Sequence, residues 1–221
     1  MTKIIAVMPL KLQNERLPGK NTKMLGDKPL LRYQLDVLSD IDMIDDIYVY
    51  CSNDIIESFL PSKVSFMRRD PSLDLPTSNF TQIFTSFMNE VDADIYIYAH
   101  ATAPFIKRET IIEEINEVLN KGYDSAFCAV KIQDFLWRNG NPLNFDAEDL
   151  PRSQDLDIIY RETSGVYVFK KEVFTQLGRR IGSNPYIHEA TFKESIDINT
   201  SADFKLAELL LNVDLEESDI S

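Results

Sequence analysis

Three cations lie close together near the start of the chain, in a loop that follows an apolar run. The run "KIIAVM" is followed by Lys11, Arg16 and Lys20, and the loop also contains Pro18 and Gly19. Arginine binds a phosphate through a fork of two N–H groups, whereas lysine acts as a point charge. Glycine lets backbone amides approach an anion, and proline restricts the loop. The pattern indicates a phosphate-binding loop, with a solvated surface loop as the alternative.

Length and charge limit the classes of partner. The chain has 221 residues and a net charge of −13, which argues against a nucleic-acid partner. A local group of cations can still bind an anionic small molecule. No apolar run approaches the ~20 residues of a membrane span and no signal peptide fits, so we expect a cytoplasmic protein without a membrane partner. Cys51 and Cys128 lie in apolar runs, and we expect both to be buried and reduced.

Short β-rich runs alternate with longer helical patterns along the chain. This order is typical of a three-layer α/β fold with a mostly parallel, Rossmann-like sheet and helices on both faces. The strands are expected at 3–8, 46–51, 63–67, 92–99, 124–130 and 164–171. Helices are expected at 28–40, 52–60, 79–90 and 107–122, with a strand, a turn and a helix within 194–212.

The pattern predicts a single domain over 1–213, followed by an acidic tail at 214–221. Residues 131–160 interrupt the alternation because they are rich in Asn, Asp, Pro and Arg and contain the only tryptophan. We expect this segment to leave the sheet as a small excursion.

The opening loop resembles that of a known enzyme family. "RLPGK" (16–20) and "GDKPLL" (26–31) are similar to the start of the cytidylyltransferases that activate acidic sugars, the CMP-acylneuraminate and CMP-Kdo synthetases. The resemblance implies that the loop wraps the triphosphate of CTP. The implied nucleotide-binding residues are Lys11, Arg16, Lys20 and Asn21, with Arg16 and Lys20 also assisting catalysis by neutralising charge. Lys11 stands where the family usually has arginine, so a cation is kept but the bidentate fork is lost.

Two further loops extend the resemblance to the nucleotide site. "RRDPSLDLPTSN" (68–79) resembles a family loop in which an arginine contacts the nucleotide, and Arg69 matches that arginine best. "HATAPFIK" (100–107) resembles a segment whose Gln and Thr lie against the nucleotide, which assigns His100 and Thr102. A neutral histidine can replace glutamine as donor and acceptor. The alternative is that His100 is a loop histidine without a ligand contact.

The segment "PRSQDLDIIYRETSGVYVF" (151–169) resembles the part of the family next to the acidic sugar. The resemblance implies sugar-binding roles for Arg152 and Tyr167, and less directly for Gln154 and Arg138. Arg152 could bind a carboxylate through a two-bond fork. It could equally be a rim arginine in a solvated or dimer-facing segment.

Near the end of the chain, "ESIDINTSADF" (194–204) resembles the family's metal-binding segment, with Asn199 in place of an aspartate. On an extended strand, residues two apart project to the same face, so Asp197 and Asn199 would face one ion. Mg²⁺ binds through one or two carboxylates together with phosphates and waters. We therefore expect Asp197, also the candidate catalytic carboxylate, and Asn199 to hold Mg²⁺. Asn199 could instead cap the last helix.

The resemblance implies a homodimeric enzyme that uses Mg²⁺, CTP and an acidic nonulosonic sugar, with the 131–160 excursion of one subunit reaching the other. Two alternatives stay open. One is a nucleotidylyltransferase with a different acceptor, such as Kdo, a sugar phosphate or a phosphonate. The other is a non-catalytic relative of the fold, suggested by the departures at Lys11, His100, Ala103 and Asn199. Magnesium-dependent CTP binding would separate the non-catalytic relative from the enzymes.

Overall fold

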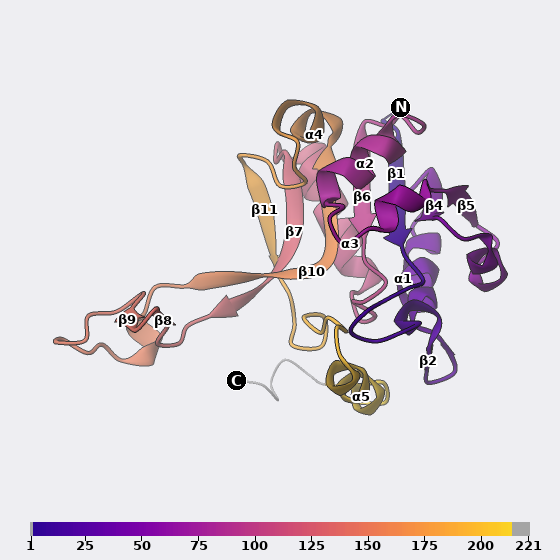
Figure 1. Cartoon of the computed structure of the whole chain (residues 1–221). Helices are drawn as coiled ribbons and strands as arrows, with labels where there is room; N and C mark the ends of the chain where they lie inside the picture. Colours follow the sequence, from indigo (N-terminus) through magenta and orange to yellow (C-terminus); the bar gives the residue numbers. More distant parts are fainter. Residues whose placement is uncertain (1, 214–221) are drawn as a thin grey trace.

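One seven-stranded sheet forms the centre of the computed structural model, which describes residues 2–213 (Figure 1). Its spatial order is β11-β7-β10-β6-β1-β4-β5. Neighbouring strands pair parallel except β10, which runs antiparallel to both β6 and β7. The strands are β1 (Ile4–Leu10), β4 (Asp46–Cys51), β5 (Val64–Arg68), β6 (Ile95–Ala99), β7 (Ser125–Ile132), β10 (Ile159–Lys170) and β11 (Pro185–Glu189). The mostly parallel α/β sheet is therefore confirmed.

Helices cover both faces of this sheet because successive strand residues point to opposite sides. On one face, Ala6 and Met8 of β1 share a buried cluster with residues of α1 (Leu30–Ser39) and α3 (Arg108–Asn120). On the other, Ile5 and Val7 pack into an aromatic-rich cluster with α2 (Phe80–Met88) and α4 (Lys171–Leu177). The predicted three-layer arrangement is confirmed.

A third, smaller cluster joins the two ends of the chain. The hairpin of β2 (Met24–Leu25) and β3 (Lys28–Pro29) follows the opening loop, and α5 (Ser201–Leu210) packs beside it. Leu25 and Leu30 are buried against Phe204 and Ile198. This contact fixes the position of the segment before α5 relative to the opening loop.

Between β7 and β10 the chain leaves the sheet as an arm, which we define as residues 133–158. Figure 1 shows this arm projecting away from the layers. It contains the short hairpin of β8 (Trp137–Arg138) and β9 (Asn141–Pro142) and the 3₁₀ turn η4 (Ser153–Asp155). Phe135 and Trp137 each pack edge-on against Phe145, yet Trp137 remains 60% exposed.

The structure corrects several sequence expectations. The expected strand within 194–199 is not formed, because backbone bonds such as Ile196 N–H to the Lys193 carbonyl fold the chain into turns instead. The segment expected as a helix at 52–60 forms a 3₁₀ helix, η2 (Asp54–Phe59). Shorter 3₁₀ helices, η1 (Lys20–Thr22) and η3 (Pro71–Asp74), lie in the loops after β1 and β5. The sequence reasoning missed α4 and β11, which are both short. Pro185 argues against a strand, but β11 is an edge strand, where proline is tolerated. The acidic tail at 214–221 lies outside the described residues.

Both cysteines are buried and free, as expected. Within residues 2–213 no helix is long and apolar enough to cross a membrane. Cys128 donates its thiol hydrogen to Oε1 of Glu114 across 3.1 Å. Glu114 lies on α3 with no exposed surface, and burial raises its pKa to about 8. The folded protein therefore keeps this carboxyl protonated at neutral pH.

We predict that Glu114 makes the protein less stable as the pH rises from about 4.5 to about 8. In this range the unfolded chain ionises the carboxyl while the folded chain keeps its proton, so unfolding releases a proton. Each pH unit across the window costs about 1.4 kcal/mol at most. Chemical denaturation of Glu114→Gln at several pH values should show a flatter dependence, whereas the exposed control Glu109→Gln should keep the native slope. Equal slopes for both variants would contradict the assignment.

Candidate active site

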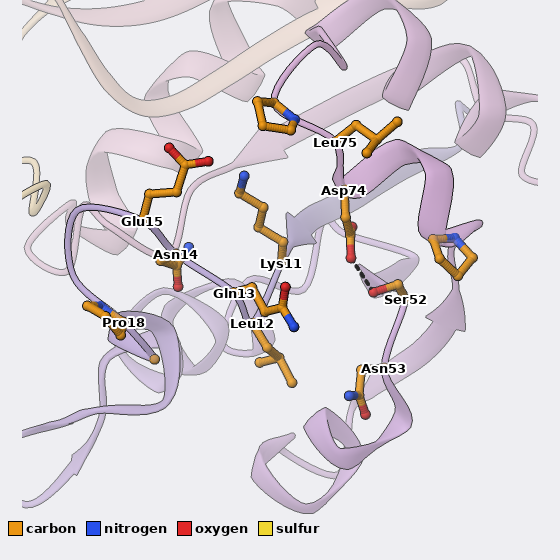
Figure 2. Close-up of a pocket in the computed structure, with 13 residues that line it drawn as sticks. Lys11, Leu12, Gln13, Asn14, Glu15, Pro18, Ser52, Asn53, Asp74 and Leu75 are labelled. Atoms are coloured by element: carbon orange, nitrogen blue, oxygen red, sulfur yellow. Dashed lines mark hydrogen bonds between the residues drawn. The ribbon is translucent and has the colours of Figure 1, made fainter.

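The predicted nucleotide residues lie in loops at the carboxyl ends of β1, β5 and β6, at one edge of the sheet. Ligands of open α/β sheets bind at this edge. A groove of about 720 Å³ opens between the first loop and the loop after β5, lined among others by Lys11, Ser52 and Asp74. Figure 2 shows Lys11 between the opening loop and Asp74. Lys11 also lines two adjoining hollows of about 360 and 180 Å³, so the cleft is continuous around it.

The opening loop is held in shape by its own backbone. Gly19 begins η1 with a φ of +65°, in the left-handed region that glycine adopts without strain. Asn21 is buried, and its side-chain amide donates to the Lys11 carbonyl across 3.0 Å. Asn21 therefore supports the loop as a structural residue, and its predicted contact with the nucleotide stays a prediction.

Two of the loop cations reach the segment that precedes α5. Lys20 Nζ donates to the Ile198 carbonyl at 2.8 Å, and Arg16 Nη2 donates to Asn199 Oδ1 at 2.7 Å. Asn199 Nδ2 in turn donates to Asp197 Oδ2 at 2.5 Å. Residues from opposite ends of the sequence thus form one polar group. Burial lowers the pKa of Lys20, partly offset by the nearby Asp197 carboxylate.

Asp197 has one oxygen available for a ligand. Its Oδ1 is buried and has no hydrogen-bond partner among the described residues, whereas Oδ2 accepts from Asn199. Within residues 2–213 no group of three or more His, Cys, Asp or Glu side chains could hold a metal by itself. Asp197 therefore fits a metal that also binds phosphate oxygens. Thr200, and not Asn199, is the N-cap of α5, in a reciprocal capping box with Asp203.

Arg69 lies in the floor of the cleft. Its side chain is only 3% exposed, it forms an ion pair with Asp74, and its Nε has no partner among the described residues. Asp74 also accepts a hydrogen bond from the Ser52 hydroxyl at 2.5 Å. The guanidinium lies 5.9 Å from the Tyr50 ring. A buried arginine with a free donor suits a neutral hydrogen-bond acceptor such as a carbonyl or a ring nitrogen.

His100 and Thr102 continue this edge beyond β6. The Nε2 atom of His100 is buried without a partner among residues 2–213, and burial, with nearby Arg180 and Lys20, lowers the pKa of His100 to about 3. His100 is therefore neutral at physiological pH. The Thr102 carbonyl accepts the Ile198 N–H at 2.8 Å, which holds the Asp197 segment against this loop.

The predicted sugar residues are divided between two places. Tyr167 is fully buried in β10, its ring 6.1 Å from that of His100. Arg138, Arg152 and Gln154 lie on the arm. Arg152 forms a two-bond fork with the Asp155 carboxylate, at 2.6 and 3.0 Å. One chain thus brings the nucleotide and metal candidates together but leaves the arm residues apart from them.

Several residues of the site were missed by the sequence reasoning. Ser52 and Asp74 line the groove, and Arg180 contacts Tyr167 and Glu162 beside His100. Asp74 could have been found, because it lies five residues after Arg69 in the same polar loop. No sequence pattern indicated Arg180, because it follows a helix that was not predicted and matches no motif.

The fold is that of the α/β nucleotidyltransferases. It superposes with a TM-score of 0.69 and 17% identity on CMP:2-keto-3-deoxy-manno-octonic acid synthetase complexed with CTP, over 95% of this chain and 98% of that one. A TM-score of 0.68 at 14% identity relates it to 4-diphosphocytidyl-2C-methyl-D-erythritol synthase of Anaerococcus prevotii, over 96% and 97% of the two chains. The chain belongs to the cytidylyltransferase family, whose model matches residues 5–220.

Sequence relatives carry more specific names. N-acylneuraminate cytidylyltransferase A of Danio rerio is 25% identical over 202 residues, which cover 87% of this chain and 47% of that protein. CMP-N,N′-diacetyllegionaminic acid synthase of Legionella pneumophila is 26% identical over 97% of this chain and 98% of its own length. The chain thus spans about half the length of the N-acylneuraminate relatives and nearly all of the legionaminic acid relative.

We predict that Asp74→Asn destabilises the protein by about 2 kcal/mol, because it leaves the buried Arg69 charge without its counterion. Urea denaturation measures the loss. Asp70→Asn is the matched control in the same loop, since Asp70 caps η3 and asparagine caps a helix equally well. If the two variants lost the same stability, the Arg69–Asp74 pair would not be what holds this loop.

Proposed function

We propose that the protein transfers CMP from CTP to an acidic nonulosonic sugar of the acylneuraminate type and releases pyrophosphate. The observation that carries the proposal is the polar group that joins Arg16 and Lys20 to Asp197 through Ile198 and Asn199. It places two cations and a carboxylate with a free oxygen at the ligand-binding edge of the sheet. Membership of the cytidylyltransferase family and the names of the relatives support this choice.

In the proposed reaction the anomeric hydroxyl oxygen of the sugar attacks the α-phosphorus of CTP in line. The bond from that phosphorus to the α–β bridging oxygen breaks, pyrophosphate leaves, and the hydroxyl proton passes to Asp197 or to solvent. Lys11, Arg16 and Lys20 neutralise the triphosphate, so catalysis consists of positioning and charge stabilisation. Arg69 and Ser52 face the groove in which the nucleoside would lie.

The donor set suits Mg²⁺. Asp197 would hold the ion through its unpartnered Oδ1, and the triphosphate would provide further oxygens. When bound, Mg²⁺ supplies positive charge against the triphosphate. Asn199 already donates to Asp197 and accepts from Arg16, so it orients these two side chains in the absence of the ion.

The surface of the arm suggests a way for its arginines, which lie apart from the cleft of their own chain, to reach the acceptor in a second copy. Its exposed apolar side chains, including Trp137 and Leu150 at 60% and 65% exposure, suit burial against a second copy. We propose a homodimer in which the arm of one subunit brings Arg152, Gln154 and Arg138 toward the acceptor side of the other.

Pyrophosphate release with each of the four nucleoside triphosphates, with and without Mg²⁺, tests the function. The acceptor panel contains N-acetylneuraminic acid, N,N′-diacetyllegionaminic acid and Kdo. We expect release only with CTP, Mg²⁺ and a nine-carbon acid. Release with Kdo alone would replace the proposed acceptor, and CTP binding without turnover on any acid would favour a different acceptor class. The absence of nucleotide binding would identify a non-catalytic relative.

We predict that Asn199→Asp makes the fold depend more strongly on Mg²⁺. Without metal the variant places two carboxylates side by side and loses the donor to Asp197, which lowers the melting temperature. With CTP and Mg²⁺ the added charge strengthens metal binding, so the gain in melting temperature should exceed that of the native protein. Thermal denaturation with and without both ligands measures the difference. Equal gains would mean that residue 199 does not face the ion.

We predict that Trp137→Glu weakens the dimer at least tenfold by placing a charge in the arm's apolar surface. Sedimentation velocity over a range of concentrations measures the equilibrium. Leu209→Glu on α5 is the control, because Leu209 is 73% exposed and lies away from the arm sequence. A native protein that stays monomeric, or two variants that dissociate equally, would contradict the proposed interface.

A further inference from the structure

Arg180 lies between α4 and β11 and carries a partly unused guanidinium group. Its Nη2 donates to the Tyr167 hydroxyl at 2.9 Å and to Glu162 Oε1 at 3.1 Å. The guanidinium carbon stacks 3.8 Å from the centre of the Tyr167 ring. Within residues 2–213, Nε and Nη1 make no hydrogen bond, and the side chain is 26% exposed. Glu162 and Tyr167 thus fix the group while three N–H donors stay available.

Edge-to-face contacts between aromatic rings connect Arg180 to the cleft. The Tyr167 ring lies 6.1 Å from His100, and His100 lies 5.2 Å from Tyr98. After burial, Arg180 and Lys20 are the groups that lower the pKa of His100. Burial raises the pKa of Tyr98 to about 12, against the opposing effect of Arg180 and Arg69. The positive charge of Arg180 therefore acts on Tyr98 and His100 at the end of β6, as the charges of Arg69 and Lys20 do.

His100 provides a second, independent sign of a ligand. Its Nε2 is buried without a partner among the described residues, which is costly unless a ligand satisfies it. Because His100 is neutral, it can hydrogen-bond a sugar hydroxyl without adding charge. The adjacent free donors of Arg180 favour a carboxylate. Among the described residues, Arg180 uses only Nη2 in its ion pair with Glu162, whereas Arg152 already uses both Nε and Nη2 in its fork with Asp155 on the arm.

Resting on the proposed function, we propose that Arg180 is a binding residue for the acidic sugar: its free N–H donors receive the sugar carboxylate, and His100 receives an adjacent hydroxyl. Glu162 and Tyr167 hold the guanidinium in place for this contact. The carboxylate of the acceptor then meets a cation supplied by the same chain that binds CTP. An acceptor without a carboxylate would leave the Nε and Nη1 donors of Arg180 unused, which gives the site its preference for acids.

Steady-state kinetics, with each substrate varied while the other is saturating, tests the assignment with Arg180→Gln. We expect the KM for the acidic sugar to rise at least tenfold, while the KM for CTP changes less than twofold. Arg180→Lys keeps the charge and should recover part of the loss. Arg179→Gln is the matched control, because within residues 2–213 the hydrogen bonds of the Arg179 side chain go to Gly182 and Ser183. An unchanged acceptor KM, an equal effect in the control, or an equal rise in the KM for CTP would overturn the proposal.

A binding measurement keeps this test separate from that of the proposed function. The chain has two histidines, so their ring resonances can be followed by NMR. His188, on β11 beside Glu113, is the internal reference. We expect N-acetylneuraminate or N,N′-diacetyllegionaminate to shift the His100 signal in the native protein and not in Arg180→Gln. If no acid is turned over, the proposed function fails and this measurement still decides the role of Arg180. The absence of a shift in the native protein would refute that role.

Discussion

The site depends on the attachment of the opening loop to the segment before α5. Lys20 reaches a backbone carbonyl and Arg16 reaches a side-chain amide of that segment, which brings residues 178 and 183 positions apart into contact. Within residues 2–213 neither cation forms an ion pair with a carboxylate, so the hydrogen bonds and the small cluster around Leu25 and Phe204 fix the geometry. The large sheet provides the edge, and this junction adds two cations and the Asp197 carboxylate to it.

The same junction explains why the net charge is a poor guide to the ligand. The chain carries −13 overall, yet two carboxylates near the cleft are engaged in local bonds. Asp74 pairs with Arg69, and Asp203 caps α5. The cations of the opening loop keep hydrogen-bond donors for an anion, because a carbonyl and an amide accept from them without cancelling their charge.

Much of the fold was predictable because its signals are local. The strands at 46–51 and 63–67 are short β-rich runs, and the helix ending before Gly122 shows regular spacing of apolar residues. The segment at 194–199 was predicted as a strand because its alternating pattern is strand-like. Its Ile198 N–H donates to the Thr102 carbonyl, but within residues 2–213 the segment pairs with no strand. Asp197 and Asn199 still face each other, since a turn can place them together as an extended strand would. The prediction was wrong about the backbone, and a shared metal ion at this pair stays a prediction.

The rest of the site could not be predicted from local patterns. Arg180 contacts Tyr167 only because α4 returns the chain to the sheet edge, and Asp74 acquires its role only when Arg69 is buried. The arm residues that were predicted to bind the sugar lie apart from the cleft of their own chain, and no local pattern predicts where the arm lies. Short motifs therefore indicate the loops that carry the predicted nucleotide residues, whereas contacts between distant segments bring these loops together.

Calorimetric titration of CTP and of CMP into the native protein and Lys20→Met, in Mg²⁺, tests the central claim most directly. If the junction is a triphosphate site, the variant should bind CTP at least tenfold more weakly and CMP almost as well as the native protein does. Lys23→Met, which removes an exposed neighbouring cation, should bind both ligands normally. Equal losses for CTP and CMP, or no loss at all, would show that the opening loop does not hold the triphosphate.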